Sequence, residues 1–206
     1  MMSQKFLYEE SVKRCVAFLK LNRVAEPRFI TYAEVTDSYD RNLVSRVRGG
    51  STVGMATGIY TKHPRLGPTV YVNLAKCAQP ILNPGFRRWS YPCWKTDRTP
   101  MGVVAHEVGH HVSASLRSSQ KIIREKWNVA ARGKRVTGYE PCPEEAMAET
   151  LRMFILNPTL LEAAIPRRYT FLIDVLGLRP SESRNWQEVL GNYPEYVVAG
   201  AHWIRK

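Results

Sequence analysis

The spacing of apolar residues divides the chain into a mixed early part and a helical later part. In residues 4–21 apolar side chains recur every three or four positions, which predicts an amphipathic helix. Residues 28–34, 55–61 and 69–74 are instead rich in β-branched and aromatic residues, which predicts strands. A turn rich in proline and glycine separates the last two segments, so we expect a hairpin there. Residues 79–100, with several prolines and aromatics, predict an ordered irregular loop.

Helix signals dominate the chain after this loop. Thr99 is a good N-cap and Pro100 suits the first helical position, so we expect a helix over residues 100–116. Further helices are predicted over 118–131 and over 143–156, and the second of them stops at an Asn-Pro pair. Short helices are expected to follow four later residues, namely Pro158, Pro166, Ser181 and Pro194.

Length and composition fit one folded domain. The 206 residues are 44% hydrophobic, which excludes a disordered chain and provides enough apolar side chains for one core. No linker or internal repeat interrupts the sequence, so we predict a single α+β domain over residues 1–206. The four cysteines include no CxxC pair, and neither a signal peptide nor an apolar segment of membrane length is visible. We therefore expect a cytoplasmic protein without a membrane partner.

One motif in the predicted 100–116 helix carries recognisable chemistry. His106, Glu107 and His110 fit the pattern HExxH. At about 3.6 residues per turn the two histidines share one face and can hold the same zinc ion, while Glu107 can reach a water on that ion. Zinc lowers the pKa of such a water to about 7, and a carboxylate beside it can take the proton as the water attacks a carbonyl. The motif therefore predicts zinc-dependent peptide hydrolysis.

A glycine inside this motif predicts tight packing. Gly109 lowers the stability of the helix by about 1 kcal/mol relative to alanine. A residue without a side chain lets a second backbone come closer than any other residue type does. We therefore expect another backbone to approach the helix at Gly109.

Two histidines leave a zinc ion short of a third protein ligand. The extended pattern HExxHxxGxxH would need a histidine where the chain has Leu116, so a carboxylate further along is required. The last of the three long predicted helices carries Glu145 and Glu149, one turn apart on one face. Glu140 and Glu144 are alternative ligands nearby in sequence, but the register with Glu149 favours Glu145.

Together these motifs resemble those of a known family. The segment HEVGHH at residues 106–111, followed by Tyr139 and by EEAMAETLRMF at 144–154, is similar to the catalytic domain of anthrax lethal factor. It is also similar to related single-domain metallopeptidases, some of which are encoded by phages. Residues 103–178 carry the resemblance. It implies a zincin-like fold with a zinc-binding core over about residues 100–156.

The resemblance also implies roles for individual residues. The glutamate that opens the ExxAE segment is the third zinc ligand in that family, and Glu145 corresponds to it. Glu149 would then orient a ligating imidazole through its other ring nitrogen. Tyr139 corresponds to a tyrosine that helps to stabilise the oxyanion. A phage-encoded enzyme of this kind would act in the cytoplasm of its host.

An edge strand before the active-site helix binds the peptide substrate in enzymes of this kind. By analogy we place residues 69–74 there, with Val72 and Asn73 contacting the peptide. The same segment fits a plain core strand equally well, and this alternative stays open.

Basic residues outnumber acidic ones. The chain has 30 lysines and arginines against 18 aspartates and glutamates, a net charge of +12 that attracts acidic partners. Residues 51–135 hold 14 of the basic residues but only three acidic ones. This charge favours an acidic peptide substrate or nucleic acid, although an ordinary solvated surface explains it most simply. The alternative function is accordingly a basic nucleic-acid-associated or partner-binding protein with a structural or degenerate zinc site.

Two further residues near the motif receive simpler explanations. His111 points away from the other two histidines of the helix, and we expect it to pack in the core or to support the site. Cys142 lies near the predicted ligands in sequence. We interpret it as structural, because no removable propeptide is apparent.

Overall fold

The computed structural model describes residues 3–35, 57–77, 99–116, 120–133, 135–136 and 140–181. These ranges contain helices and a small mixed sheet, which confirms the α+β class. Residues 79–98 of the loop predicted over 79–100 lie outside the described residues, as do Tyr139 and the helices predicted after Ser181 and Pro194.

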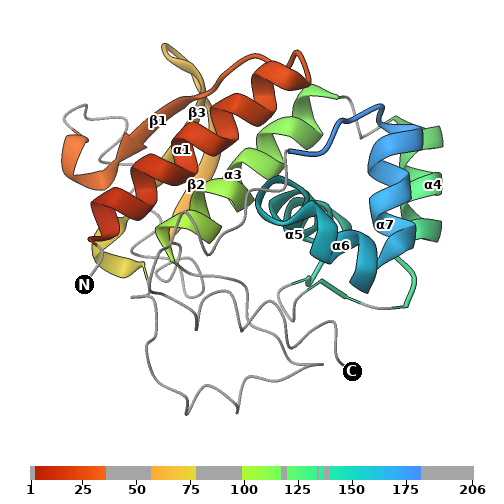
Figure 1. The fold of residues 1–206 in the computed structure, drawn as a ribbon. Coiled ribbons are helices and arrows are strands. Elements are labelled where there is room, and N and C mark those ends of the chain that lie inside the picture. Colours follow the sequence, from red (N-terminus) through yellow and green to blue (C-terminus); the bar gives the residue numbers. More distant parts are fainter. Residues whose placement is uncertain are drawn as a thin grey trace.

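Three strands form the sheet, in the order β1-β3-β2 (Figure 1). β1 (Arg28–Thr31) pairs with β3 (Gly67–Val72) in parallel, and β2 (Gly58–His63) pairs with β3 in antiparallel orientation. β2 and β3 form the predicted hairpin. His63 Nδ1 stabilises its turn by accepting two backbone hydrogen bonds, at 3.1 and 2.9 Å.

The first strand is shorter than predicted. β1 ends at Thr31, and a 3₁₀ turn over Tyr32–Glu34 follows. Glu34 explains the difference, because its Oε2 accepts hydrogen bonds from the Thr31 backbone N–H at 2.7 Å and from the Thr31 hydroxyl at 2.8 Å. These local bonds favour a turn over the continuation of the strand.

The central strand of the described sheet is β3, which corrects our placement of the edge strand. Val72 is fully buried and pairs with Thr31 on one side and with Gly58 on the other. Asn73 follows the strand and donates its backbone N–H to the Thr57 carbonyl at 2.8 Å. The placement of Val72 and Asn73 on a free edge is therefore wrong, because β1 occupies the side that we expected to be open. The core-strand alternative is confirmed.

The three long helices follow the predicted boundaries closely. They are α1 (Gln4–Leu21), α3 (Pro100–Ser115) and α5 (Pro143–Leu156). The Thr99 side chain caps α3 as predicted, accepting a hydrogen bond from the Gly102 N–H at 3.4 Å.

The remaining helices lie at the far end of the molecule, beyond α5 (Figure 1). They are α4 (Lys121–Ala130), α6 (Pro158–Ala164) and α7 (Pro166–Thr170), and a π-helical turn over Phe171–Val175 continues α7. α4 is shorter than the predicted helix over 118–131, of which residues 118 and 119 are not described. No helix among the described residues combines the length and apolar character that crossing a bilayer requires.

α3 lies at the centre of the core. α1 and α5 pack against it, and β2 and β3 also contact it. From Pro100 to Gly109 every residue of α3 is buried. The HExxH motif therefore lies on a helix that is covered on almost all sides, as expected for an apolar core helix.

The backbones of α3 and α5 come close together at Gly109, as the sequence predicts. A Cβ atom built at Gly109 would lie 2.7 Å from the Ala148 carbonyl oxygen and 3.0 Å from the Ala148 Cα. Both are backbone atoms, which cannot move aside as a flexible side chain can. The glycine thus allows α5 to bring its own side chains to the histidines of α3.

Candidate metal centre

Three side chains that the sequence predicts as zinc ligands converge between α3 and α5. The Nε2 atoms of His106 and His110 are 3.2 Å apart. Glu145 Oε2 lies 3.1 Å from His106 Nε2, and Glu145 Oε1 lies 3.5 Å from His110 Nε2. One ligand atom from each residue falls within 4.8 Å of the others, so the group could hold a metal ion.

The elements that carry these ligands determine their placement. His106 and His110 are one turn apart on α3, so their side chains project from the same face. Glu145 lies in the first turn of α5, where the helix dipole favours a negative charge. The close packing of the two helices then places the carboxylate opposite both imidazoles.

The chemistry of the group fits a divalent cation. Glu145 Oε2 is buried and has no hydrogen-bond partner among the described residues, although it lies close to His106. A buried carboxylate oxygen without a partner costs free energy unless a cation or a donor compensates it. Two imidazole nitrogens and one carboxylate are ligands that zinc accepts.

His106 is held in place from behind by Glu149. Its Nδ1 lies 2.7 Å from Glu149 Oε1, and the carboxylate of Glu149 is fully buried. Arg152 donates from both Nε and Nη2 to the two oxygens of Glu149, each at 3.1 Å. With Nδ1 engaged in this way, Nε2 of His106 faces the group. Glu149 thus lies where the resemblance implied.

The charges of the group reinforce one another. Burial lowers the pKa of His106, but its close contacts with the carboxylates of Glu145 and Glu149 outweigh this effect, and the net shift is upward. The imidazoles of His106 and His110 beside Glu145 lower the pKa of its carboxyl. The carboxylates therefore favour a positive charge at the imidazoles, which a divalent cation supplies as well as a proton does.

Glu107 lies beside the group, against strand β2. Its side chain is buried, which raises the pKa of its carboxyl, and the two histidines and a hydrogen bond from the Tyr60 backbone partly offset this rise. The approach is close. A Cβ atom built at Gly58 would lie 2.8 Å from both Cγ and Oε1 of Glu107 and 2.6 Å from Val103 Cγ1. Gly58 therefore leaves the space that the Glu107 side chain occupies.

The alternative carboxylate ligands have other surroundings. Glu140 is buried and forms an ion pair with Arg168, with Arg168 Nη2 at 2.9 Å from Glu140 Oε2. It also accepts a hydrogen bond from the Val136 N–H at 2.5 Å. Glu144 is exposed on the first turn of α5. Of the predicted candidates, only Glu145 joins the two histidines among the described residues.

His111 agrees with the simpler explanation, and the structural role of Cys142 stays a prediction. His111 is buried on another side of α3, where its ring nitrogens lie 2.6 Å from the Ala25 carbonyl and 3.3 Å from the Tyr60 hydroxyl. It connects α3 to β2 and to the segment before β1. Cys142 is exposed immediately before α5, and it is not one of the three grouped ligands.

Two contributors to the site escaped the sequence analysis. Arg152 clamps Glu149, and its position three residues later on the same helix is the signal that could have revealed it. Gly58 lies inside a predicted strand, where a glycine can indicate the close approach of another element. Tyr139, the predicted oxyanion stabiliser, lies outside the described residues.

Comparison with known proteins adds no relative. No family model, curated protein or solved structure matches the chain. The fold and the site therefore define a mixed α+β protein with a His-His-Glu group that could hold a metal ion.

We expect Glu149→Gln to weaken metal binding by about 10- to 100-fold, because a neutral amide holds the His106 ring and its charge less effectively. Titration against a chromophoric chelator measures the change. Glu144→Gln removes the same charge from an exposed position of α5 and serves as the control. Equal affinities of the two variants would contradict the role given to Glu149.

Proposed function

We propose that the protein is a zinc-dependent endopeptidase with a zincin-like fold. The observation that carries this proposal is the convergence of His106, His110 and Glu145, with Glu107 buried beside them. Two histidines and a glutamate are a known ligand set of catalytic zinc, and this set leaves a fourth position for water or substrate. The resemblance of the two helix motifs to lethal-factor-like metallopeptidases points to the same activity.

A zinc ion bound by these three ligands would supply an activated water and polarise the carbonyl of the substrate. Glu107 would act as the general base, taking a proton and later giving it to the leaving amine. Its burial raises the pKa of the carboxyl toward the operating range, which suits a group that must both accept and donate a proton.

The surrounding residues would hold this geometry fixed. Glu149 and Arg152 form a buried ion pair that orients His106. Strand β2 is an edge strand of the described sheet, and its backbone at Tyr60 hydrogen-bonds Glu107. In this proposal β2, rather than β3, borders the substrate.

A structural zinc site is the less economical alternative. Structural zinc sites have four protein ligands, whereas the group among the described residues contains three, namely His106, His110 and Glu145. A purely structural site also does not require a buried glutamate beside its ligands. These two observations favour catalysis over a metal site that only stabilises a nucleic-acid-binding protein.

Metal analysis and a cleavage assay test the proposal together. Mass spectrometry of the zinc-loaded protein should find one zinc ion per chain, and Glu145→Ala should lose most of it. Glu144→Ala, on the neighbouring exposed position, is the control and should retain the metal. The wild type should cut a mixed peptide library, and Glu145→Ala should not. A wild type that takes up no zinc and cuts no peptide would overturn the proposal.

A further inference from the structure

The exposed surface of α4 carries more basic than acidic residues. Lys121, Arg124 and Lys126 are all exposed, on different sides of the helix. Glu125 is the single acidic residue of the helix, and it lies 4.0 Å from Lys121, with both side chains mostly exposed. Such an exposed pair contributes little to stability, so it does not explain why the helix carries so many cations.

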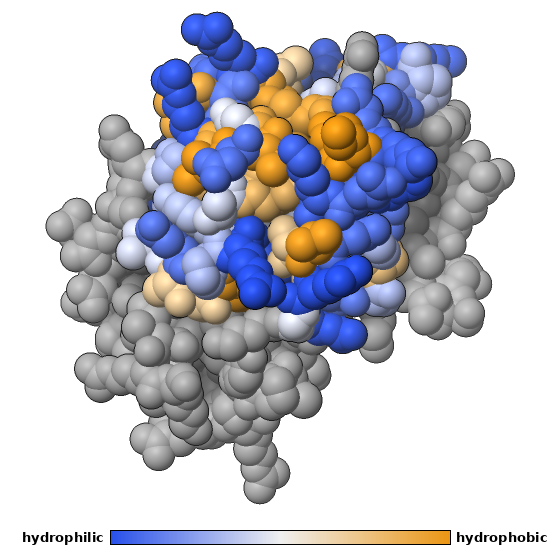
Figure 2. Space-filling model, turned by 90° about the vertical axis from the view of Figure 1, so that its right-hand side faces the viewer, coloured by the Kyte–Doolittle hydropathy of each residue, from blue (hydrophilic) through white to orange (hydrophobic). Residues whose placement is uncertain are grey.

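Two aliphatic side chains project from the same helix. Ile122 is 62% exposed and Val129 is 58% exposed, and they are the most exposed large apolar side chains among the described residues. They are seven residues apart, so about two helical turns place them on one side of α4. Figure 2 views this side of the molecule, where separate apolar patches lie among hydrophilic residues.

The inner face of α4 is already fixed to the protein. Trp127 is buried, and its Nε1 donates a hydrogen bond to the Pro143 carbonyl at 3.2 Å. It also stacks near Arg168, which lies 5.4 Å from the ring centre. The exposed aliphatic residues are therefore not needed to hold the helix, and they are available to a partner.

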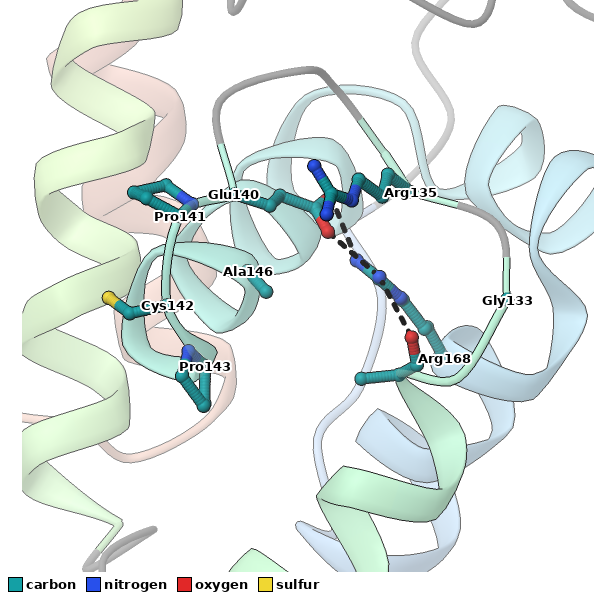
Figure 3. A pocket seen from close by; sticks show the side chains of 9 residues that line it. Gly133, Arg135, Glu140, Pro141, Cys142, Pro143, Ala146 and Arg168 are labelled. Atoms are coloured by element: carbon teal, nitrogen blue, oxygen red, sulfur yellow. Dashed lines mark hydrogen bonds and ion pairs between the residues drawn. The ribbon is translucent and has the colours of Figure 1, made fainter.

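A cavity of about 350 Å³ lies beyond the end of α4 (Figure 3). The exposed Arg135 lines it, as does Arg168, which points toward Glu140. Because Glu140 balances the charge of Arg168, Arg135 is the cation of this cavity that has no acidic partner among the described residues. Pro143 also lines the cavity and opens α5, the helix that carries Glu145. Exposed basic side chains therefore lie both on α4 and in the cavity beside the start of the metal-binding helix.

We propose that the exposed surface of α4 and this cavity bind an acidic segment of a protein substrate that also carries aliphatic side chains. This inference rests on the proposed function in one respect, because the partner is a substrate only if the protein is a peptidase. Charge complementarity selects an acidic partner. Ile122 and Val129 favour a peptide over nucleic acid, because no aromatic side chain of α4 is exposed for base stacking and phosphates gain nothing from aliphatic contacts.

Fluorescence anisotropy tests the binding directly. The probe is a labelled peptide rich in glutamate with interspersed leucines, titrated with the zinc-loaded Glu107→Gln protein so that cleavage cannot interfere. Arg124→Glu/Lys126→Glu is expected to weaken binding at least about tenfold. Lys5→Glu/Lys20→Glu makes the same charge change on α1, across the molecule in Figure 1, and should leave the affinity within about twofold.

Serine substitutions separate the apolar contribution from the charge. Ile122→Ser/Val129→Ser should weaken peptide binding about tenfold without changing the net charge. Phe6→Ser/Leu21→Ser replaces exposed apolar residues of α1 and should have little effect. Equal losses in the α1 and α4 charge variants would overturn the proposal. The proposal would also be overturned if duplex DNA of similar charge bound as tightly as the peptide and its affinity did not change in Ile122→Ser/Val129→Ser.

Cleavage of a neutral peptide, measured in proteins that retain Glu107, distinguishes the two proposals. The cleavage rate of Arg124→Glu/Lys126→Glu should equal that of the wild type if α4 binds only the acidic segment. A wild type that cuts neither the neutral nor the acidic peptide would contradict the proposed function, while the anisotropy measurement would still decide whether α4 binds acidic peptides.

Discussion

Glu107→Gln should retain zinc and lose peptide cleavage, with kcat reduced by about a hundredfold or more. Glutamine fills nearly the same volume beside strand β2 but cannot take a proton. The three ligands His106, His110 and Glu145 are unchanged, so the site can still hold a metal ion. The measurement is kcat and KM on a cleaved peptide, together with the zinc content of the same preparation.

The interpretation of this variant depends on its metal content. Glu144→Gln removes an exposed carboxylate from α5 and should behave as the wild type. A Glu107→Gln protein that keeps both its zinc and its kcat would exclude Glu107 as the general base. Loss of zinc together with activity would instead assign Glu107 a role in building the site.

Gly109→Ala should destabilise the protein by about 2 kcal/mol, although alanine is the better helix former. Helix propensity alone would stabilise the variant by about 1 kcal/mol. Against this gain, the new Cβ would lie 2.7 Å from the Ala148 carbonyl oxygen, a backbone atom of α5. Overpacking of this kind costs about 1–3 kcal/mol and can exceed that range where backbone must move. The clash therefore outweighs the propensity.

Urea unfolding of the metal-free protein measures this effect without a contribution from zinc binding. Ser115→Ala lies at the exposed end of the same helix and reports the propensity gain without a clash. A Gly109→Ala protein that is more stable than the wild type would show that α3 and α5 do not approach as closely as the structure indicates. We also expect weaker zinc binding in this variant, because moving α5 displaces Glu145.

Local signals were sufficient for the helices that carry the site. The three- and four-residue spacing of apolar side chains predicted α1, and the Thr99-Pro100 start predicted α3. A terminating Asn-Pro pair placed the end of α5. These signals operate within one turn of helix, so tertiary structure had little opportunity to override them. Strand pairing depends on distant segments, and there the prediction of a free edge at β3 failed.

The run of consecutive buried residues in β3 is a sign against its placement at a free edge. Thr69, Val70, Tyr71 and Val72 are all fully buried, whereas β2 is half-exposed over most of its length. A strand covered on both faces shows apolar residues at successive positions, and an edge strand alternates. The sequence of β3 contains this run, but a run alone does not reveal that β1 is its second neighbour.

By itself, the sequence determined the long helices, the hairpin, the HExxH residues and the need for a third ligand downstream. These follow from spacing along one helix or one turn, where geometry is nearly fixed by the backbone. The sequence favoured Glu145 as this ligand, and the resemblance implied the role of Glu149. Only the tertiary structure brought both glutamates to the histidines, placed Arg152 behind Glu149 and put β2 beside Glu107. Apart from the pair of Arg152 and Glu149, each of these contacts joins residues far apart in the chain. Their distances depend on how the helices and the sheet pack, which no local pattern encodes.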